Sequence, residues 1–405
     1  MNFKFWVFNL IFFINYLECT KILKIPFWNL EIRNFYENNI YVNLNIGKPI
    51  QTIPLFISIS FNPIYISNNK FNYKLSSTYK NKSNIKYIFK DNIDKAIESS
   101  DTFIFENNES STIDFYLINN TNYSILGLGR KIYDAISGGK WDDWNNEYNE
   151  ITDFITGLKK NNIINKSTFC IQYNNNNYGE IIFGLEYENN KDLIIYKDYY
   201  RNIMDSTWDF KFDSIFIGNI IIKEYLSSTL DIQIESFIAN KKIKVIFFNN
   251  FFKKYIEKKL CFEGKIETNI IDKFSYSFFY CKNDNNVNIK ELDILNFHFN
   301  NINYNFTFNY LDLFKIHKTK LYFQILFREE DNSMPWIFGS LFFKKYDIIF
   351  NLEKEEIIWF KKINKNPKLS FFNVIVISIF LFIIIIFQYS KRNKLKEEEY
   401  EMSLI

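Results

Sequence analysis

The segment Leu55-Phe-Ile-Ser-Ile-Ser-Phe-Asn-Pro-Ile-Tyr-Ile66 follows the stretch Tyr41-Val-Asn-Leu-Asn-Ile-Gly-Lys-Pro-Ile-Gln51. Both are rich in β-branched and aromatic residues, which is typical of strands. The Gly-Lys-Pro at 47–49 predicts a turn between them. A strand, a turn and a second strand therefore lead to Ser58, and neither Ser58 nor its neighbours Ile59 and Ser60 carries an ionisable group.

Composition excludes several classes of function. A chain of 405 residues can hold two domains with substantial cores. The formal net charge of +3 gives no reason to expect nucleic-acid binding. The two histidines, His298 and His317, lie far from acidic or cysteine clusters in the sequence. We therefore expect no metal site, no histidine-based triad and no cofactor.

Both ends of the chain resemble membrane-targeting segments. Residues 1–20 have Lys4 before a short apolar stretch, which predicts a secretory signal peptide, with an uncleaved anchor as the alternative. Residues 369–389 carry no charge, which predicts one transmembrane helix rather than a buried core helix. The basic cluster from Lys391 to Lys396 places the tail, residues 390–405, in the cytosol. The globular part would then be lumenal or extracellular, on a membrane of the secretory pathway or at the cell surface.

A secretory chain folds under oxidising conditions, so its cysteines can pair. Cys261 and Cys281 are the natural pair, whereas Cys170 lies in an apolar strand and is expected to be a buried thiol. Six sequons permit glycosylation, although an Asn-rich chain contains some by chance.

The pattern along the chain predicts a mostly β protein with a few short helices. The strand-like runs are 40–46, 53–59, 102–105, 169–173, 180–183, 208–212, 278–280, 321–327, 336–337 and 357–360, and the helix-like runs are 151–159, 247–259 and 339–345. Each half has a strand–turn–strand opening and a later apolar-Gly segment, 125–129 and 336–339. This echo predicts two β lobes, residues 39–190 and 191–363, with a central cleft between them where a ligand would bind.

Several landmarks resemble, in order, the pepsin-like aspartic protease family (peptidase A1, including the plasmepsin-like group). They include Leu75-Ser-Ser-Thr-Tyr79, Tyr123-Ser-Ile-Leu-Gly-Leu-Gly129, Phe169-Cys-Ile-Gln-Tyr173, Gly179-Glu-Ile-Ile-Phe-Gly184, the segment Trp208–Gly218, Trp336-Ile-Phe-Gly339 and Ile348-Ile-Phe-Asn351. The resemblance implies a bilobal pepsin-like fold over residues 39–363.

The resemblance also implies two catalytic motifs of the form Asp-Thr/Ser-Gly, and both are degenerate here. At the first motif Ser58 takes the Asp position and Ser60 the Gly position. The best match for the second is Glu235-Ser-Phe237, with Glu235 at the Asp position, Ser236 at the Thr/Ser position and Phe237 at the Gly position. Asp231 is an alternative occupant, although no Gly-like residue follows it. The flap Tyr falls on Phe89.

These losses favour a catalytically inactive, membrane-anchored relative of the proteases that binds a peptide or protein in the cleft. One alternative is an atypical active endopeptidase that uses Glu235 and a second, unidentified acid. Another is a structural or adhesive surface protein whose cleft is filled by side chains such as Phe61 and Phe237.

Overall fold

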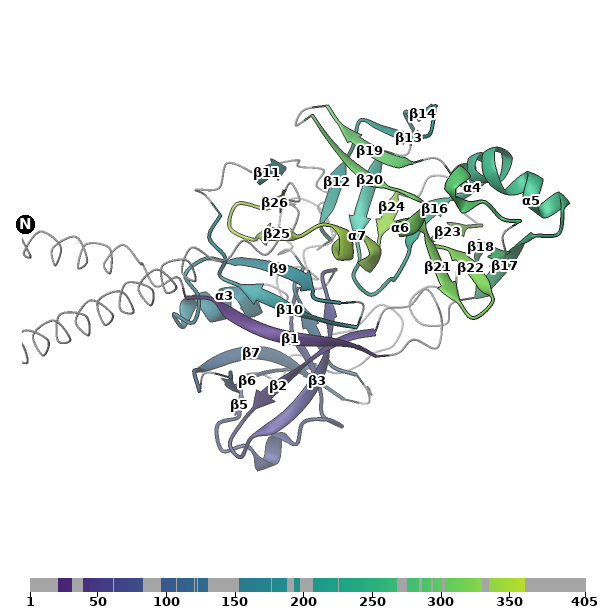
Figure 1. Cartoon of the computed structure of the whole chain (residues 1–405). Coiled ribbons are helices and arrows are strands. Elements are labelled where there is room, and N and C mark those ends of the chain that lie inside the picture. The colour runs from purple at the N-terminus through teal and green to yellow at the C-terminus, as the bar shows by residue number, and fades with distance from the viewer. Residues whose placement is uncertain are drawn as a thin grey trace, which may run out of the picture. The chain divides into compact units, whose positions relative to one another are not determined.

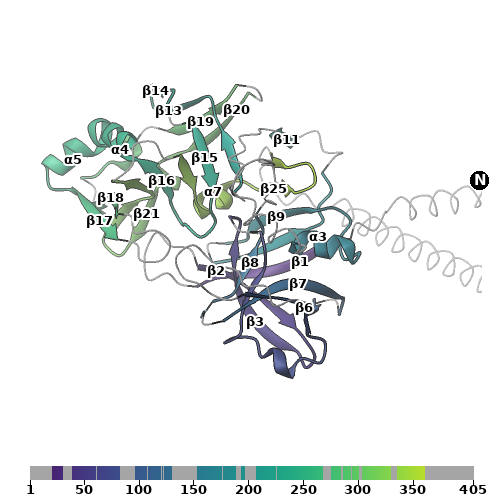
Figure 2. The same ribbon diagram turned by 180° about the vertical axis from the view of Figure 1, so that it is seen from behind.

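The computed structural model describes residues 21–30, 39–60, 62–82, 96–106, 108–119, 121, 123–129, 153–175, 177–187, 193–196, 207–224, 226–267, 275–283, 286–292, 294–300, 303–329 and 335–360. All of them belong to one compact unit, Met1–Phe360. The fold is mostly β, as predicted, and its strands form three sheets (Figures 1 and 2).

The largest sheet, the first-half sheet, has 13 strands. Its members are β1 (Leu23–Leu30), β2 (Asn39–Ile46), β3 (Gln51–Ser58), β4 (Tyr65–Ser67), β5 (Lys80–Asn81), β6 (Ala96–Ile104), β7 (Ser110–Ile118), β8 (Ile125–Gly127), β9 (Thr168–Tyr173), β10 (Tyr178–Phe183), β11 (Leu193–Tyr196), β25 (Ile348–Asn351) and β26 (Glu356–Phe360). Strand β1, which the sequence patterns did not predict, pairs with both β10 and β2.

The second-half sheet has 9 strands, and a third sheet has 4. The second-half sheet contains β12 (Asp209–Lys211), β15 (Ser227–Leu230), β16 (Phe237–Asn240), β17 (Cys261–Glu267), β18 (Ser275–Lys282), β21 (Phe314–His317), β22 (Lys320–Phe323), β23 (Ile325–Arg328) and β24 (Trp336–Phe338). The third sheet contains β13 (Ser214–Ile217), β14 (Ile220–Ile222), β19 (Leu295–Phe299) and β20 (Tyr304–Phe308).

The helices are short and lie where apolar residues recur at helical spacing. They are α3 (Phe154–Lys160), α4 (Lys241–Phe247), α5 (Lys253–Glu257), α6 (Tyr310–Leu313) and α7 (Ser340–Lys345), with 3₁₀ turns η1 (Tyr73–Leu75) and η3 (Ile289–Glu291) and a π-helical turn η2 (Phe248–Phe252) between α4 and α5. The predicted helix over 247–259 thus begins earlier, at Lys241, because the side chain of Asn240 accepts a hydrogen bond from the backbone N–H of Ile243 and caps it.

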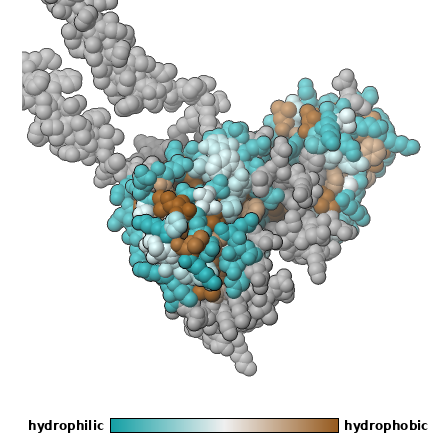
Figure 3. Space-filling model, turned by 90° about the horizontal axis from the view of Figure 1, so that it is seen from below, coloured by the Kyte–Doolittle hydropathy of each residue, from teal (hydrophilic) through white to brown (hydrophobic). Residues whose placement is uncertain are grey.

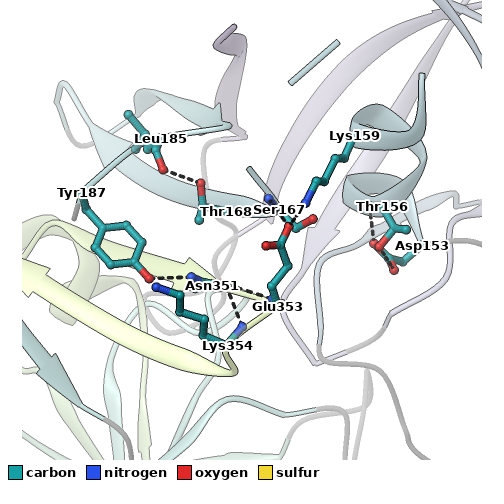
Figure 4. Close-up of polar contacts among 10 residues, drawn as sticks. All are labelled: Asp153, Thr156, Lys159, Ser167, Thr168, Leu185, Tyr187, Asn351, Glu353 and Lys354. Atoms are coloured by element: carbon teal, nitrogen blue, oxygen red, sulfur yellow. Dashed lines mark hydrogen bonds and ion pairs between the residues drawn. The ribbon is translucent and has the colours of Figure 1, made fainter. Parts of the chain in front are cut away.

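The chain returns to its first half at the end of the described region. Strand β25 pairs with β9, with Ile349 opposite Cys170, and β26 pairs with β11. Polar contacts fasten this hairpin (Figure 4): the carboxylate of Glu353 accepts hydrogen bonds from the Lys159 ammonium and from the backbone N–H of Ser167. The hairpin is therefore held by side chains as well as by strand pairing.

One aromatic-rich core extends through both halves. Phe169 of β9 stacks on Phe350 of β25 with ring centroids 4.6 Å apart, and Trp208 contacts both rings. The indole N–H of Trp208 also donates to the carbonyl of Leu128, at 3.2 Å. On the face shown in Figure 3, hydrophobic residues form separate small patches within a hydrophilic surface.

Several sequence predictions lie outside the described residues. These are the signal peptide (1–20), the transmembrane helix (369–389), the cytosolic tail (390–405) and the flap position Phe89. Within the described ranges, no helix combines the length and the apolar character needed to cross a bilayer. The two lobe boundaries and the cleft remain predictions.

The predicted disulfide between Cys261 and Cys281 is confirmed, and it joins directly opposed residues of β17 and β18. Cys170 is fully buried in β9, as expected.

Replacing both Cys261 and Cys281 by Ala should lower the free energy of unfolding by about 3 kcal/mol, because the bond restricts a loop with a sequence separation of 20 in the unfolded chain. Denaturant unfolding of the oxidised protein and the double variant measures the difference. Reduction of the unsubstituted protein should reproduce the loss, and reduction of the double variant should change nothing.

Candidate functional site

Ser58 is the last residue of β3, which belongs to a four-strand unit of the first-half sheet. Strand β3 pairs in parallel with β8, with Ser58 opposite Gly127. Strand β8 pairs antiparallel with β4, through Tyr65 and Ile125, and β4 pairs in parallel with β7. The strand order is therefore β3-β8-β4-β7.

The second-half sheet contains the same unit in the order β15-β24-β16-β23. Strand β15 pairs in parallel with β24, with Leu230 opposite Phe338. Strand β24 pairs antiparallel with β16, through Ile238 and Ile337, and β16 pairs in parallel with β23. The sense of every pairing repeats that of the first half.

When the paired residues of the two units are aligned, Asp231 is the counterpart of Ser58. Ile125 matches Ile337, so Gly127 matches Gly339, and the residue that follows Leu230 takes the place of Ser58. Tyr65 follows Ser58 by seven positions, and Ile238 follows Asp231 by seven. Glu235, which the sequence ranked first, lies four positions further along the chain.

The packing of the two glycines supports the same match. A Cβ on Gly127 would lie 2.3 Å from the carbonyl oxygen of Pro63, and a Cβ on Gly339 would lie 2.2 Å from that of Ser236. Pro63 and Ser236 each lie five positions after the matched residues Ser58 and Asp231. In both halves the turn after the matched residue therefore presses against a glycine backbone.

The matched side chains also have the same backbone partner. The N–H of Ser60 donates to the Ser58 hydroxyl oxygen at 3.2 Å, and the N–H of Gln233 donates to Oδ1 of Asp231 at 2.9 Å. Burial raises the pKa of the Asp231 carboxyl to about 6, and the hydrogen bond from Gln233 partly opposes this rise. One polar side chain from each half is thus presented in an equivalent turn, and only one of the two ionises.

The two turns contact each other through Gln233. Its side-chain Nε2 donates to the carbonyl of Ile57 at 3.4 Å, which joins the second-half turn to the strand end that carries Ser58. Ile59 and Ile232, which follow Ser58 and Asp231, are both fully buried in the main core. One amide hydrogen bond therefore joins the turns, and an isoleucine anchors each turn in the same apolar core.

Glu235 occupies a different, charged environment. Its side chain is buried, and it accepts hydrogen bonds from the Ser340 hydroxyl at 2.9 Å and from the Lys344 ammonium at 2.7 Å, with Lys315 at 3.4 Å. Burial alone would raise the pKa of the Glu235 carboxyl, but the two lysines and the hydrogen bonds lower it overall. Glu235 is therefore held ionised within an ion cluster.

The other predicted site residues lie in different surroundings from one another. Ser60 is partly exposed beside Ser58, whereas Ser236 is fully buried in the turn that contacts Gly339. Phe237 is a core residue of β16, edge-on to Phe308 and Phe338 with ring centroids 4.8 and 5.0 Å away. Phe237 thus fills the interior of the second half and does not lie in the turn with Asp231.

Gln233 is a residue of the site that the sequence analysis did not identify. It stands two positions after Asp231, where the resemblance implies a glycine, and this departure moved the best match to Glu235. The signal that locates Asp231 is its spacing of seven positions from Ile238, which repeats that between Ser58 and Tyr65.

Substituting Gly339 by Ala should lower the free energy of unfolding by about 3 kcal/mol or more, because the added Cβ would lie 2.2–2.4 Å from two carbonyl oxygens. The matched control is Gly157→Ala in α3, where the added Cβ would lie 3.9 Å from the side chain of Ile113. That change should stabilise the helix by about 0.5–1 kcal/mol. Denaturant unfolding distinguishes them, and equal effects would contradict the proposed close approach.

The Asp231 carboxyl should give the protein a distinct pH dependence. Between the ordinary value of 3.8 and about 6, the folded chain keeps a proton on Asp231 that the unfolded chain releases. The contribution of this group to the free energy of unfolding therefore falls as pH rises through that range. The Tm of Asp231→Asn relative to the unsubstituted protein should rise between pH 4 and pH 7, measured by thermal unfolding. A constant difference would show that Asp231 titrates normally.

The chain matches a model of a known protein family. A family model described as eukaryotic aspartyl protease matches residues 60–360, which begins just after Ser58 and includes Asp231. The search of curated proteins found no match. Because the family model covers well over half of the 405 residues, the chain belongs to the eukaryotic aspartyl protease family, the pepsin-like peptidases of group A1.

Proposed function

We propose that this protein is a membrane-anchored member of its family that does not hydrolyse peptide bonds and instead binds a peptide or protein segment. The observation that carries the proposal is that Ser58 and Asp231 occupy equivalent positions in the two halves. One carboxyl group stands where the family's reaction needs two.

The reaction depends on two carboxyl groups that share one proton. The ionised group takes a proton from the attacking water while the protonated group donates to the scissile carbonyl. The Ser58 hydroxyl cannot take either role, because it does not ionise near neutral pH and is a weak acid. Removing one member of a catalytic group that acts as a unit costs several orders of magnitude in rate.

The surroundings of Ser58 and Asp231 also depart from what the family's chemistry uses. Side chains stand at both positions where the resemblance implies glycine, Ser60 and Gln233. The Gln233 amide extends toward the first half and bonds to Ile57. These side chains occupy space beside the two polar groups, where a catalytic water and a scissile bond would have to fit.

Two small apolar clusters lie on strands of the two matched units. The first contains Tyr65, Tyr116 and Ile118 with Ile125 packed on it, and the second contains Ile238, Tyr276 and Leu326 with Ile337 packed on it. Both are separate from the main core, because their residues alternate along the strands with core residues such as Phe115 and Phe237. The members of both clusters are buried, but Ile125 and Ile337, which pack on them, are partly exposed and lie at matched positions of the two units. An extended peptide with an apolar side chain is therefore the ligand class that we propose.

The membrane anchor is the predicted helix at 369–389, followed by the basic residues from Lys391 onward. The disulfide between Cys261 and Cys281 supports an oxidising compartment for the globular part. We propose that this part lies in the lumen of the secretory pathway or outside the cell.

A second candidate is an atypical active endopeptidase. It is favoured by the retained carboxyl of Asp231, whose raised pKa places its titration in the mildly acidic range. This candidate needs a second acid near Asp231. Glu235, the acid suggested by the sequence, is instead engaged by Ser340 and two lysines.

The full-length protein, incubated with denatured casein between pH 3 and pH 6, should show no cleavage that pepstatin inhibits. The comparison is Ser58→Asp combined with Ser60→Gly and Gln233→Gly, which supplies the missing carboxyl and opens both turns. Pepstatin-sensitive cleavage by the unsubstituted protein, abolished by Asp231→Asn, would overturn the proposal in favour of the endopeptidase.

A further inference from the structure

The buried ion cluster around Glu235 has no part in the proposed binding site, although Glu235 lies only four positions after Asp231. Glu235 is 5% exposed and Lys344 16% exposed, and their charged atoms are 2.7 Å apart. Lys315 of β21 and the Ser340 hydroxyl complete the cluster. These four residues are called the Glu235 cluster below.

The cluster ties the turn after Asp231 to helix α7. The backbone N–H of Ser340 donates to the carbonyl of Ile234 at 2.6 Å, and that of Leu341 donates to the carbonyl of Glu235 at 3.0 Å. The Ser340 and Lys344 side chains then bind the carboxylate of Glu235 from the same helix. Both views of the ribbon show α7 beside the strands of this unit (Figures 1 and 2).

The cluster also reaches the first half of the molecule. The Lys344 ammonium lies 5.4 Å from the ring centroid of Tyr173, at the end of β9, which is a cation–π contact. The Tyr173 ring packs in turn against Phe27 of β1. Lys344 therefore contacts both the turn that follows Asp231 and the first-half sheet.

A buried ion pair is a poor way to gain stability, because desolvation offsets most of the attraction and an apolar pair of the same size often does as well. Loss of either partner, however, leaves an unpaired buried charge, which is strongly destabilising. The surrounding turn is then expected to move so that this charge can reach water. In some proteins such a pair also fixes one conformation more strictly than apolar packing does.

We propose that Glu235 is a positioning residue for Asp231, holding the turn at 231–236 against α7 and, through Lys344, in fixed register with the first-half sheet. The inference rests on the proposed function in taking Asp231 as the polar group of the site. Its test needs no ligand, so failure of peptide binding and failure of this inference can be told apart.

The test compares full-length Glu235→Gln and Lys344→Met with the unsubstituted protein by hydrogen exchange and mass spectrometry. Amides of 232–237 and 340–345 should exchange at least threefold faster in either variant, because each removes the same ion pair. Combining the two substitutions should add little to either single effect, since the pair acts as a unit.

A second readout separates positioning from general loss of stability. Labelling of Asp231 with carbodiimide and glycine ethyl ester, followed over pH, should be several-fold faster in Glu235→Gln, because the carboxyl becomes more exposed. The labelling profile should also shift toward that of an ordinary aspartate.

The control is Glu329→Gln, which removes one of the two carboxylate partners of Lys244, at 2.6 Å, in a pair with side-chain exposures of 14% and 19%. It should leave exchange at 232–237 and labelling of Asp231 unchanged. Unchanged exchange and labelling in Glu235→Gln would overturn the inference, as would equal changes in Glu329→Gln.

Discussion

The close approach of a glycine to a turn, made once in each half, is the constraint on which the rest of this structure depends. Gly127 and Gly339 let strands β8 and β24 pass directly beneath the turns that follow Ser58 and Asp231. A side chain at either glycine would push the turn away and break the parallel pairing. The two polar residues face the same environment because their strands end against the same kind of neighbour.

That constraint concerns backbone shape and is independent of whether the protein cuts peptides. The glycines, the strand order and the backbone N–H donors of residues 60 and 233 all remain in place. What has changed is the chemistry presented by the turns: a hydroxyl at Ser58, apolar Ile59 and Ile232, and an amide at Gln233. This combination agrees with the binding role that we propose, in which a polar group would orient a bound backbone without polarising it for attack.

The sequence was enough to predict a mostly β fold, the disulfide and the strand–turn–strand segment that ends at Ser58. Those features rest on local patterns: β-branched runs, a Gly-Lys-Pro turn and an obvious cysteine pair. The counterpart of Ser58 was harder, because the comparison relied on a glycine two positions later and the chain has Gln233 there. Strand register, which depends on pairing between residues about one hundred positions apart, such as Leu230 and Phe338, distinguishes Asp231 from Glu235. Strand β1 was missed for a related reason: Pro26 weakens its strand pattern, and its pairing with β10 is a long-range contact.

The return of β25 to β9 has a consequence for biogenesis. Ile349 lies opposite Cys170, so one pairing within the first-half sheet joins residues separated by nearly half of the chain. Contacts of such long range form slowly. During synthesis one edge of β9 stays unpaired until the last strands leave the ribosome. An unpaired edge of this kind invites association with other chains. The nascent first half is therefore expected to carry an exposed strand edge at β9 for most of its translation.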